Sequence, residues 1–251
     1  MSAAEQTPIE TAADGSFQPL LLRYETVRQF SSQKLLFRSS LVIQSMELGT
    51  LEQEQYRYVA RRTVQSEQLF GRHLHKVVEA LPELLKENPR LDAVSIPVYN
   101  RMLKKSSLAG AIFKELSAHP GVSASNLMVE VSADILYEEL EPLQQELERV
   151  RNMGVRVAIW ELGDPFCPLL RLRELSYDYL ILDSWAVNLL AYEHTEDFES
   201  LCRFLHTREK TRIIAPGISD VSLLESAEKL GCDGYTLTPE ADLPPEEEDE
   251  L

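Results

Sequence analysis

The chain has 251 residues, 44% of which are hydrophobic, and its formal net charge at pH 7 is −16. The length suits one large α/β domain, and the hydrophobic share can supply a sizeable core. The strong negative charge argues against nucleic acid and against an anionic membrane surface as general partners.

Both ends of the chain are predicted to lie outside the folded domain. Residues 1–16 are small, polar and acidic, which is typical of a disordered leader and not of a signal peptide. Residues 240–251 hold an acidic run without Lys or Arg, which predicts a disordered solubilising tail, with an acidic docking peptide as the alternative. The chain has no apolar run of membrane-spanning length, and its three cysteines are widely spaced. We therefore expect a cytoplasmic protein with reduced thiols and no cofactor.

Strand and helix patterns alternate along the predicted domain, residues 17–239. The first two strand-like runs, 17–23 and 31–43, have a short connection and are expected to form a hairpin. Six further strands are predicted at 91–98, 127–131, 155–160, 178–183, 212–215 and 233–237. Helices are predicted at 51–87, 100–118, 132–154, 169–175, 185–206 and 219–230. Eight strands alternating with helices after the first two predict an α/β fold, a single TIM-type (β/α) barrel.

The run from Val155 to Phe166 carries the strongest functional signal in this pattern. A helix ends at Gly154, a buried strand follows, and a Gly-Asp-Pro loop ends that strand. Functional residues of such barrels lie at the carboxyl ends of the strands. Here the strand ends in Trp160-Glu161, so one acid stands where two adjacent acids would form a metal site.

An ordered set of motifs, covering residues 17–239, resembles the EAL family of cyclic-di-GMP phosphodiesterases. Each motif alone is weak, and the specificity comes from their order and spacing. The motifs are Phe17–Leu20, Lys34–Arg38, Val129–Ser132, Asp178–Asp183, Ala215–Ile218, and Gly231–Tyr235 with Pro239. The resemblance implies a TIM-type barrel of the EAL kind and a nucleotide site at its mouth.

The family's metal-binding and catalytic positions are mostly altered in this sequence. Glu130 is retained, but Lys34 replaces the signature glutamate. The other altered positions are Pro97, Trp160, Glu161, Ile181, Pro216 and Asp233. Divalent cations for phosphodiester hydrolysis need several oxygen ligands, and a lysine ammonium would repel them. We therefore expect no bound metal and no catalytic residues, and we expect Lys34 to pair with Glu130 or Glu161 inside the barrel mouth.

Nucleotide binding could survive the loss of hydrolysis. The resemblance implies that Gln18 and Arg38 contact the nucleotide. Arg38 could hold a phosphate through two hydrogen bonds, or it could instead pair with an acid of the protein. Glu130, Asp183, Tyr235 and Pro239 complete the set of ligand-binding candidates. Trp160 is expected to pack in the former pocket, with a base-stacking platform as the alternative.

Three functions follow from this sequence. The first is a catalytically inactive EAL-like domain that regulates an unknown protein partner through direct contact, with a homodimer as a further option. The second is a non-hydrolysing cyclic-di-GMP receptor. The third, an enzyme of different chemistry, is weakest because no nucleophile–base pair is visible. His73 and His75 lie two residues apart on a predicted helix, so they do not share a face and form a poor metal pair.

Overall fold

The computed structural model describes residues 20–45, 49–53, 55–56, 66–162, 168–184, 186–188, 195–206 and 211–242. The predicted leader at 1–16, the candidate Gln18, the loop at 163–167 and residues 243–251 lie outside the described residues.

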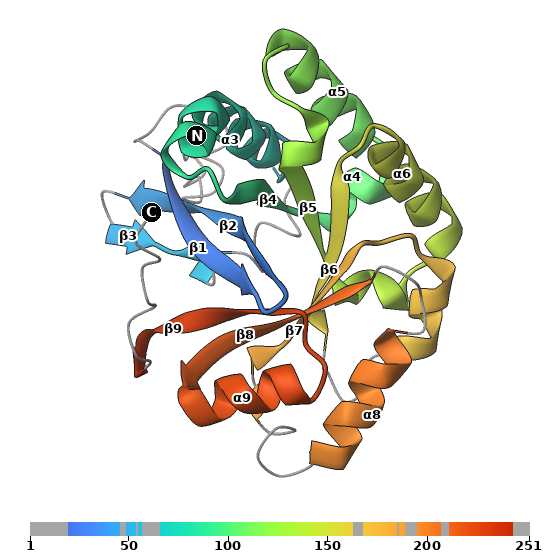
Figure 1. The fold of residues 1–251 in the computed structure, drawn as a ribbon. Coiled ribbons are helices and arrows are strands. Elements are labelled where there is room, and N and C mark those ends of the chain that lie inside the picture. Colours follow the sequence, from blue (N-terminus) through green and yellow to red (C-terminus); the bar gives the residue numbers. More distant parts are fainter. Residues whose placement is uncertain are drawn as a thin grey trace, which may run out of the picture.

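Eight strands close into a barrel, as the sequence predicts (Figure 1). In chain order they are β1 (Leu21–Gln29), β2 (Ser32–Ser45), β4 (Leu91–Val98), β5 (Leu127–Ser132), β6 (Arg156–Leu162), β7 (Tyr179–Leu182), β8 (Arg212–Asp220) and β9 (Gly234–Asp242). The strands from β2 onward run parallel around the ring. β1 forms the predicted hairpin with β2 and pairs antiparallel with β9, which completes the ring. A short strand, β3 (Gly49–Leu51), pairs with β2 outside the ring.

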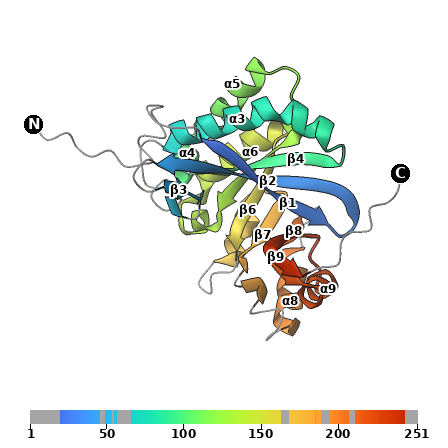
Figure 2. The ribbon, with the colours of Figure 1, turned by 90° about the vertical axis from the view of Figure 1, so that its left-hand side faces the viewer.

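Helices cover the outside of the barrel (Figures 1 and 2). They are α3 (Ser66–Glu87), α4 (Asn100–Lys104), α5 (Leu108–Ala118), α6 (Leu140–Asn152), α8 (Thr195–Leu205) and α9 (Val221–Lys229). None of the helices in the described part of the chain is long and apolar enough to span a membrane. One hydrophobic core lies between these helices and the strands, and a smaller one fills the barrel. β4 is buried along almost its whole length, which explains its nearly continuous apolar sequence.

The closure between β1 and β9 depends on a close backbone approach. Arg28 pairs with Tyr235, and Gln29 pairs with Gly234. A Cβ atom on Gly234 would lie 2.5 Å from the carbonyl oxygen of Arg28. Only glycine allows the two strands to meet at this distance without a shift of the backbone.

The structure corrects several predicted element boundaries. The helix predicted at 100–118 is broken into α4 and α5 around Ser106, which has a positive φ of 51°. The helix predicted from residue 132 begins as a 3-10 turn, Ala133–Tyr137, and α6 starts only at Leu140. The helix predicted from residue 219 begins at Val221, after Asp220, which caps α9 by accepting a hydrogen bond from the Leu223 amide. β9 runs to Asp242, so the predicted tail boundary at residue 240 lies three residues too early.

Candidate functional site

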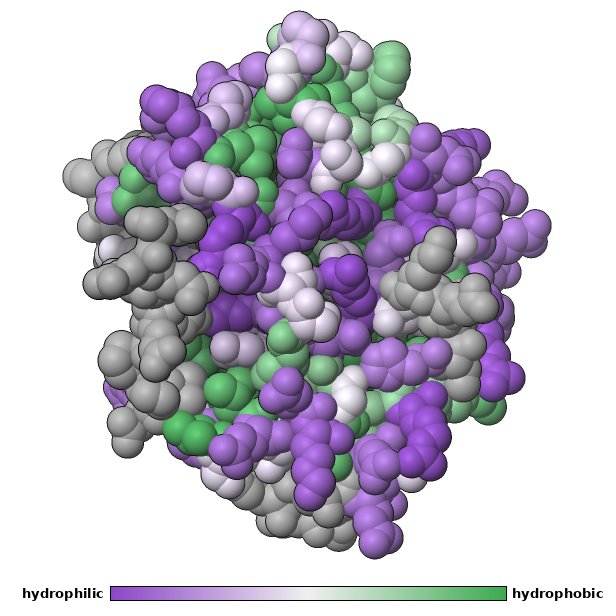
Figure 3. Space-filling view, in the orientation of Figure 1, coloured by the Kyte–Doolittle hydropathy of each residue, from purple (hydrophilic) through white to green (hydrophobic). Residues whose placement is uncertain are grey.

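A cavity of about 730 Å³ lies at the carboxyl ends of the barrel strands, the barrel mouth. Five carboxylates and three arginines line it, so the formal charge of the lining is negative. Figure 3 shows that the face drawn in the orientation of Figure 1 is largely hydrophilic, with smaller hydrophobic patches. The cavity brings together eight residues singled out from the sequence: Arg38, Glu130, Trp160, Glu161, Ile181, Asp183, Pro216 and Pro239.

An arginine–glutamate pair forms the centre of the mouth. Arg38 on β2 donates from Nε and Nη2 to the two carboxylate oxygens of Glu130 on β5, at 2.8 and 2.9 Å. Its Nη1 donates to Glu25 on β1 at 2.9 Å. The Ser95 hydroxyl donates to the same Glu130 carboxylate at 2.5 Å. Both oxygens of the one retained metal-ligand candidate are therefore engaged by groups of the protein.

The charge of this pair is internally balanced. The Arg38 and Glu130 side chains are only 17% and 4% exposed. Burial opposes the charge on Arg38, but attraction to and hydrogen bonds with Glu130 and Glu25 raise its pKa above the ordinary value. The guanidinium carbon also lies 5.9 Å from the ring centre of Trp160, within cation–π range. Arg38 is thus a permanent cation held by two carboxylates and an indole.

A buried hydrogen-bond network of His73, Ser39 and Ser95 adjoins the Arg38–Glu130 pair. The Ser39 hydroxyl donates to the Ser95 carbonyl oxygen at 2.5 Å and lies 2.8 Å from Nε2 of His73. Burial lowers the pKa of His73 to about 3, so its ring is neutral. Because the Ser39 proton goes to the carbonyl, Nε2 of His73 must be the donor to the Ser39 oxygen. This network fixes the backbone that carries Arg38 and Ser95.

Lys34 does not enter the mouth, and its predicted pairing with Glu130 or Glu161 is wrong. It lies near the start of β2, at the amino end of the barrel, where its side chain is 62% exposed. Its Nζ lies 3.0 Å from an oxygen of Asp92. The cation that contacts Glu130 is Arg38, four residues further along the strand.

Three of the altered positions place side chains without oxygen near the site. Pro97 on β4 lies directly opposite Glu130 in the strand register, where the resemblance implies an asparagine. Proline has no backbone N–H to donate to a neighbouring strand. Pro97 needs none toward β2, because the pairing of β2 with β4 ends at Ser95. Ile181 is buried inside the barrel, and Pro216 lines the cavity.

The end of β6 differs from an ordinary strand. Glu161 has a positive φ of 60°, a conformation that costs a residue with a Cβ roughly 1–2 kcal/mol. Its carboxylate accepts a hydrogen bond from Ser132 at 3.1 Å. The pairing of β6 with β7 is irregular between Ile159 and Leu162. This strained turn aims Trp160 and Glu161 into the cavity lining.

Two other sequence candidates lie away from the mouth. Asp233 stands before β9, where its carboxylate accepts from the Ile213 amide at 2.7 Å and contacts His206 at 3.0 Å. Tyr235 packs against Phe30 near the tip of the hairpin, with ring centres 4.9 Å apart. Both therefore belong to the amino end of the barrel, and neither lines the described cavity.

Two residues that complete the site, Glu25 and Ser95, belong to none of the sequence motifs. Glu25 lies opposite Arg38 in the hairpin register, and Ser95 lies beside it on β4. Glu25 sits five residues after the quoted Phe17–Leu20 motif and belongs to none. The alternation along the strand at Leu91–Val98 could have marked Ser95 as facing the barrel interior together with Pro97.

A closed barrel that is parallel except at β1, with its cavity at the carboxyl ends of the parallel strands, defines the protein as a TIM-type α/β barrel. The chain belongs to the EAL-domain family, whose model matches residues 16–236. The curated relative "Uncharacterized protein y4lL" of Sinorhizobium fredii (strain NBRC 101917 / NGR234) is 29% identical over 105 residues. This match covers 42% of the chain and 12% of that protein, so the chain spans a small part of its length.

Several solved structures are similar to this chain. The EAL domain of FimX from Pseudomonas aeruginosa, bound to c-di-GMP, is 16% identical and has a TM-score of 0.79, with 92% of each chain covered. The PaMucR phosphodiesterase in complex with c-di-GMP is 18% identical and has a TM-score of 0.78, with 91% of this chain and 92% of that chain covered. At these identities the likeness concerns the fold.

Proposed function

We propose that this chain is a catalytically inactive EAL domain that acts as a regulatory protein through contacts with another protein. The observation that carries the proposal is the double hydrogen bond between Arg38 and Glu130. It supports inactivity because the guanidinium occupies both oxygens of the retained carboxylate with a fixed positive charge.

The rest of the mouth supports the same conclusion. Besides Glu130, the residues at the carboxyl ends of β6 and β7 offer Glu161 and Asp183 as oxygen ligands. A divalent cation placed between them and Glu130 would lie close to the Arg38 charge and be repelled. Of the five carboxylates in the lining, Glu25 and Glu130 are held by Arg38, and Glu52 is held by Arg23. Glu161 and Asp183 are too few for two metal ions, as used for in-line phosphoryl chemistry.

The experiment is a hydrolysis assay with cyclic-di-GMP and Mg²⁺ or Mn²⁺, run on the 251-residue chain. We expect no turnover above a control without protein, and an unchanged result for Glu130→Gln. Turnover in the wild-type chain that Glu130→Gln abolishes would overturn the proposal. The regulatory half is tested by isolating the protein that co-purifies with the chain and asking whether its activity changes when the chain is added.

A second candidate function, a non-hydrolysing cyclic-di-GMP receptor, is favoured by the open cavity itself. Its volume falls in the range typical of small-molecule sites, and Trp160 offers an aromatic face in its wall. Because Arg38 already donates to two carboxylates and the lining is negative, we expect weak binding of a dianion. Calorimetry with cyclic-di-GMP in the absence of metal decides between the two. Tight binding that Trp160→Ala removes would promote the receptor function.

A further inference from the structure

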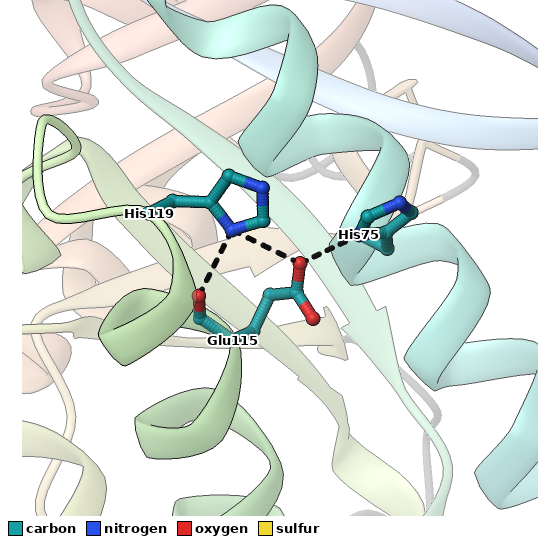
Figure 4. A group of neighbouring side chains, drawn as sticks. All are labelled: His75, Glu115 and His119. Atoms are coloured by element: carbon teal, nitrogen blue, oxygen red, sulfur yellow. Dashed lines mark hydrogen bonds and ion pairs between the residues drawn. The ribbon is translucent and has the colours of Figure 1, made fainter.

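A cluster of two histidines and a glutamate lies outside the barrel, between α3 and α5 (Figure 4). His75 comes from α3 and Glu115 from α5, and His119 directly follows the last residue of α5. Figure 4 shows the Glu115 carboxylate between the two imidazole rings. In the part of the chain that the structure describes, no other three side chains of this kind bring their ligand atoms so close together.

The three side chains are already arranged around a common point. The Glu115 carboxylate oxygen lies 2.7 Å from Nδ1 of His75 and 3.3 Å from Nδ1 of His119. One ligand atom from each residue lies within 4.8 Å of the other two. Ligands of a tetrahedral zinc ion at about 2.0–2.2 Å stand roughly 3.3–3.6 Å apart. To meet that spacing, the His75 and Glu115 side chains would separate slightly, and Nδ1 of His119 would exchange its 3.0 Å hydrogen bond with the Glu115 carbonyl oxygen for the ion.

We propose that His75, Glu115 and His119 form a binding site for a divalent transition-metal ion of the Zn²⁺ type. Two imidazoles and one carboxylate are ligands that Zn²⁺ accepts, and with three protein ligands the fourth position goes to water. The mixed nitrogen and oxygen set disfavours Mg²⁺ and Ca²⁺, which take oxygen ligands.

A second carboxylate orients the first histidine. Glu79, one turn after His75 on α3, lies 3.3 Å from its Nε2. This leaves Nδ1 of His75 facing Glu115, and a carboxylate behind the non-ligating nitrogen is the usual outer partner of a metal-bound histidine.

The bound ion would join two helices that are distant in sequence. His75 and Glu115 are separated by 40 positions, and the side chains of all three ligands remain partly exposed, at 49%, 20% and 28%. An ion can therefore reach the cluster from solvent and then hold α5 against α3. The site is separate from the barrel mouth, so this inference does not depend on the proposed function.

The test is calorimetric titration of Zn²⁺ into the full chain, prepared without a histidine tag and stripped of metal. We expect one saturable site, at least ~10-fold weaker in His75→Gln and in His119→Gln. Saturating Zn²⁺, at about 100 times its Kd, should raise the melting temperature of the wild-type chain by about 5–10 °C, and at the same concentration that of the two variants by about half as much or less. Mg²⁺ at the same concentrations should not compete.

The matched control is His206→Gln. His206 is another partly exposed histidine beside a carboxylate, 3.0 Å from Asp233, but it lies near the amino end of the barrel. This variant should bind Zn²⁺ like the wild-type chain. Equal binding by all four proteins, or the absence of a saturable site in the wild-type chain, would overturn the proposal. Melting temperatures measured without metal show whether each variant is folded.

Discussion

The two ends of the barrel hold opposite arrangements of charge. At the mouth, one cation, Arg38, is held by the carboxylates of Glu130 and Glu25. At the amino end, one carboxylate, Asp92, is held by two cations, Lys34 at 3.0 Å and Arg156 at 2.5 Å. Glu130 is almost fully buried, whereas the Asp92 side chain is 19% exposed. Losing a partner should therefore cost far more at the mouth than at the amino end.

The largest effect is expected from Arg38→Met. It leaves the Glu130 charge buried without its cation, and it should lower the free energy of unfolding by about 3–5 kcal/mol. Urea unfolding followed by circular dichroism measures this change. A loss below about 1 kcal/mol would mean that water reaches Glu130 and that the pair is not buried in solution.

The double variant Arg38→Met, Glu130→Leu tests whether the stability lost in Arg38→Met comes from the unpaired charge of Glu130. Replacing both members removes the unpaired charge, so most of the stability lost in Arg38→Met should return. The change of unfolding free energy is measured as before, beside each single variant. A double variant as unstable as Arg38→Met would show that packing, and not charge, dominates at this position.

An intermediate effect is expected from Arg156→Met at the amino end. Hydrogen bonds from Arg156 and Lys34 lower the pKa of Asp92 despite its partial burial. After the substitution Lys34 still neutralises Asp92, so we expect a loss of about 1–2 kcal/mol in the same unfolding measurement. A loss as large as that of Arg38→Met would erase the contrast between the two ends.

The smallest effect is expected from Lys34→Ala. The lysine side chain is mostly exposed, and Arg156 remains beside Asp92, so the loss should be under about 1 kcal/mol. Salt titration provides the check, because an exposed pair is screened over roughly 8–10 Å at moderate ionic strength. A larger, salt-independent loss would show that Lys34 acts inside the barrel.

The fold was predictable from the sequence because burial leaves a strong pattern. The strand at Leu91–Val98 matches its predicted bounds, since residues buried on both faces form a mostly apolar run, interrupted here by Asp92 and Ser95. The breaks in the helices at Ser106 and before Leu140 were not predictable in the same way. They are set by local backbone geometry, which hydrophobic spacing does not encode.

The centre of the site was predicted less well because a sequence motif does not show which of its residues lies at which end of the barrel. Lys34 and Arg38 belong to one matched motif, yet four residues along a strand span roughly 13 Å. The registers of β2 with β4 and of β4 with β5, which pair Arg38 with Ser95 and Pro97 with Glu130, show which cation reaches Glu130. The cluster of His75, Glu115 and His119 was missed because its members meet only after α3 and α5 have packed.

The antiparallel seam between β1 and β9 has a consequence for how the chain folds. Arg28 and Gln29 find their partners at Tyr235 and Gly234, about two hundred residues later, so the ring closes through one of the longest loops available to this chain. Contacts so distant in sequence slow folding and leave the edges of β1 and β8 exposed until β9 arrives. A partly folded barrel would offer these edges to other chains. Because only glycine at position 234 lets β9 pair closely with β1, this residue helps the folding chain to avoid aggregation and also stabilises the closed barrel.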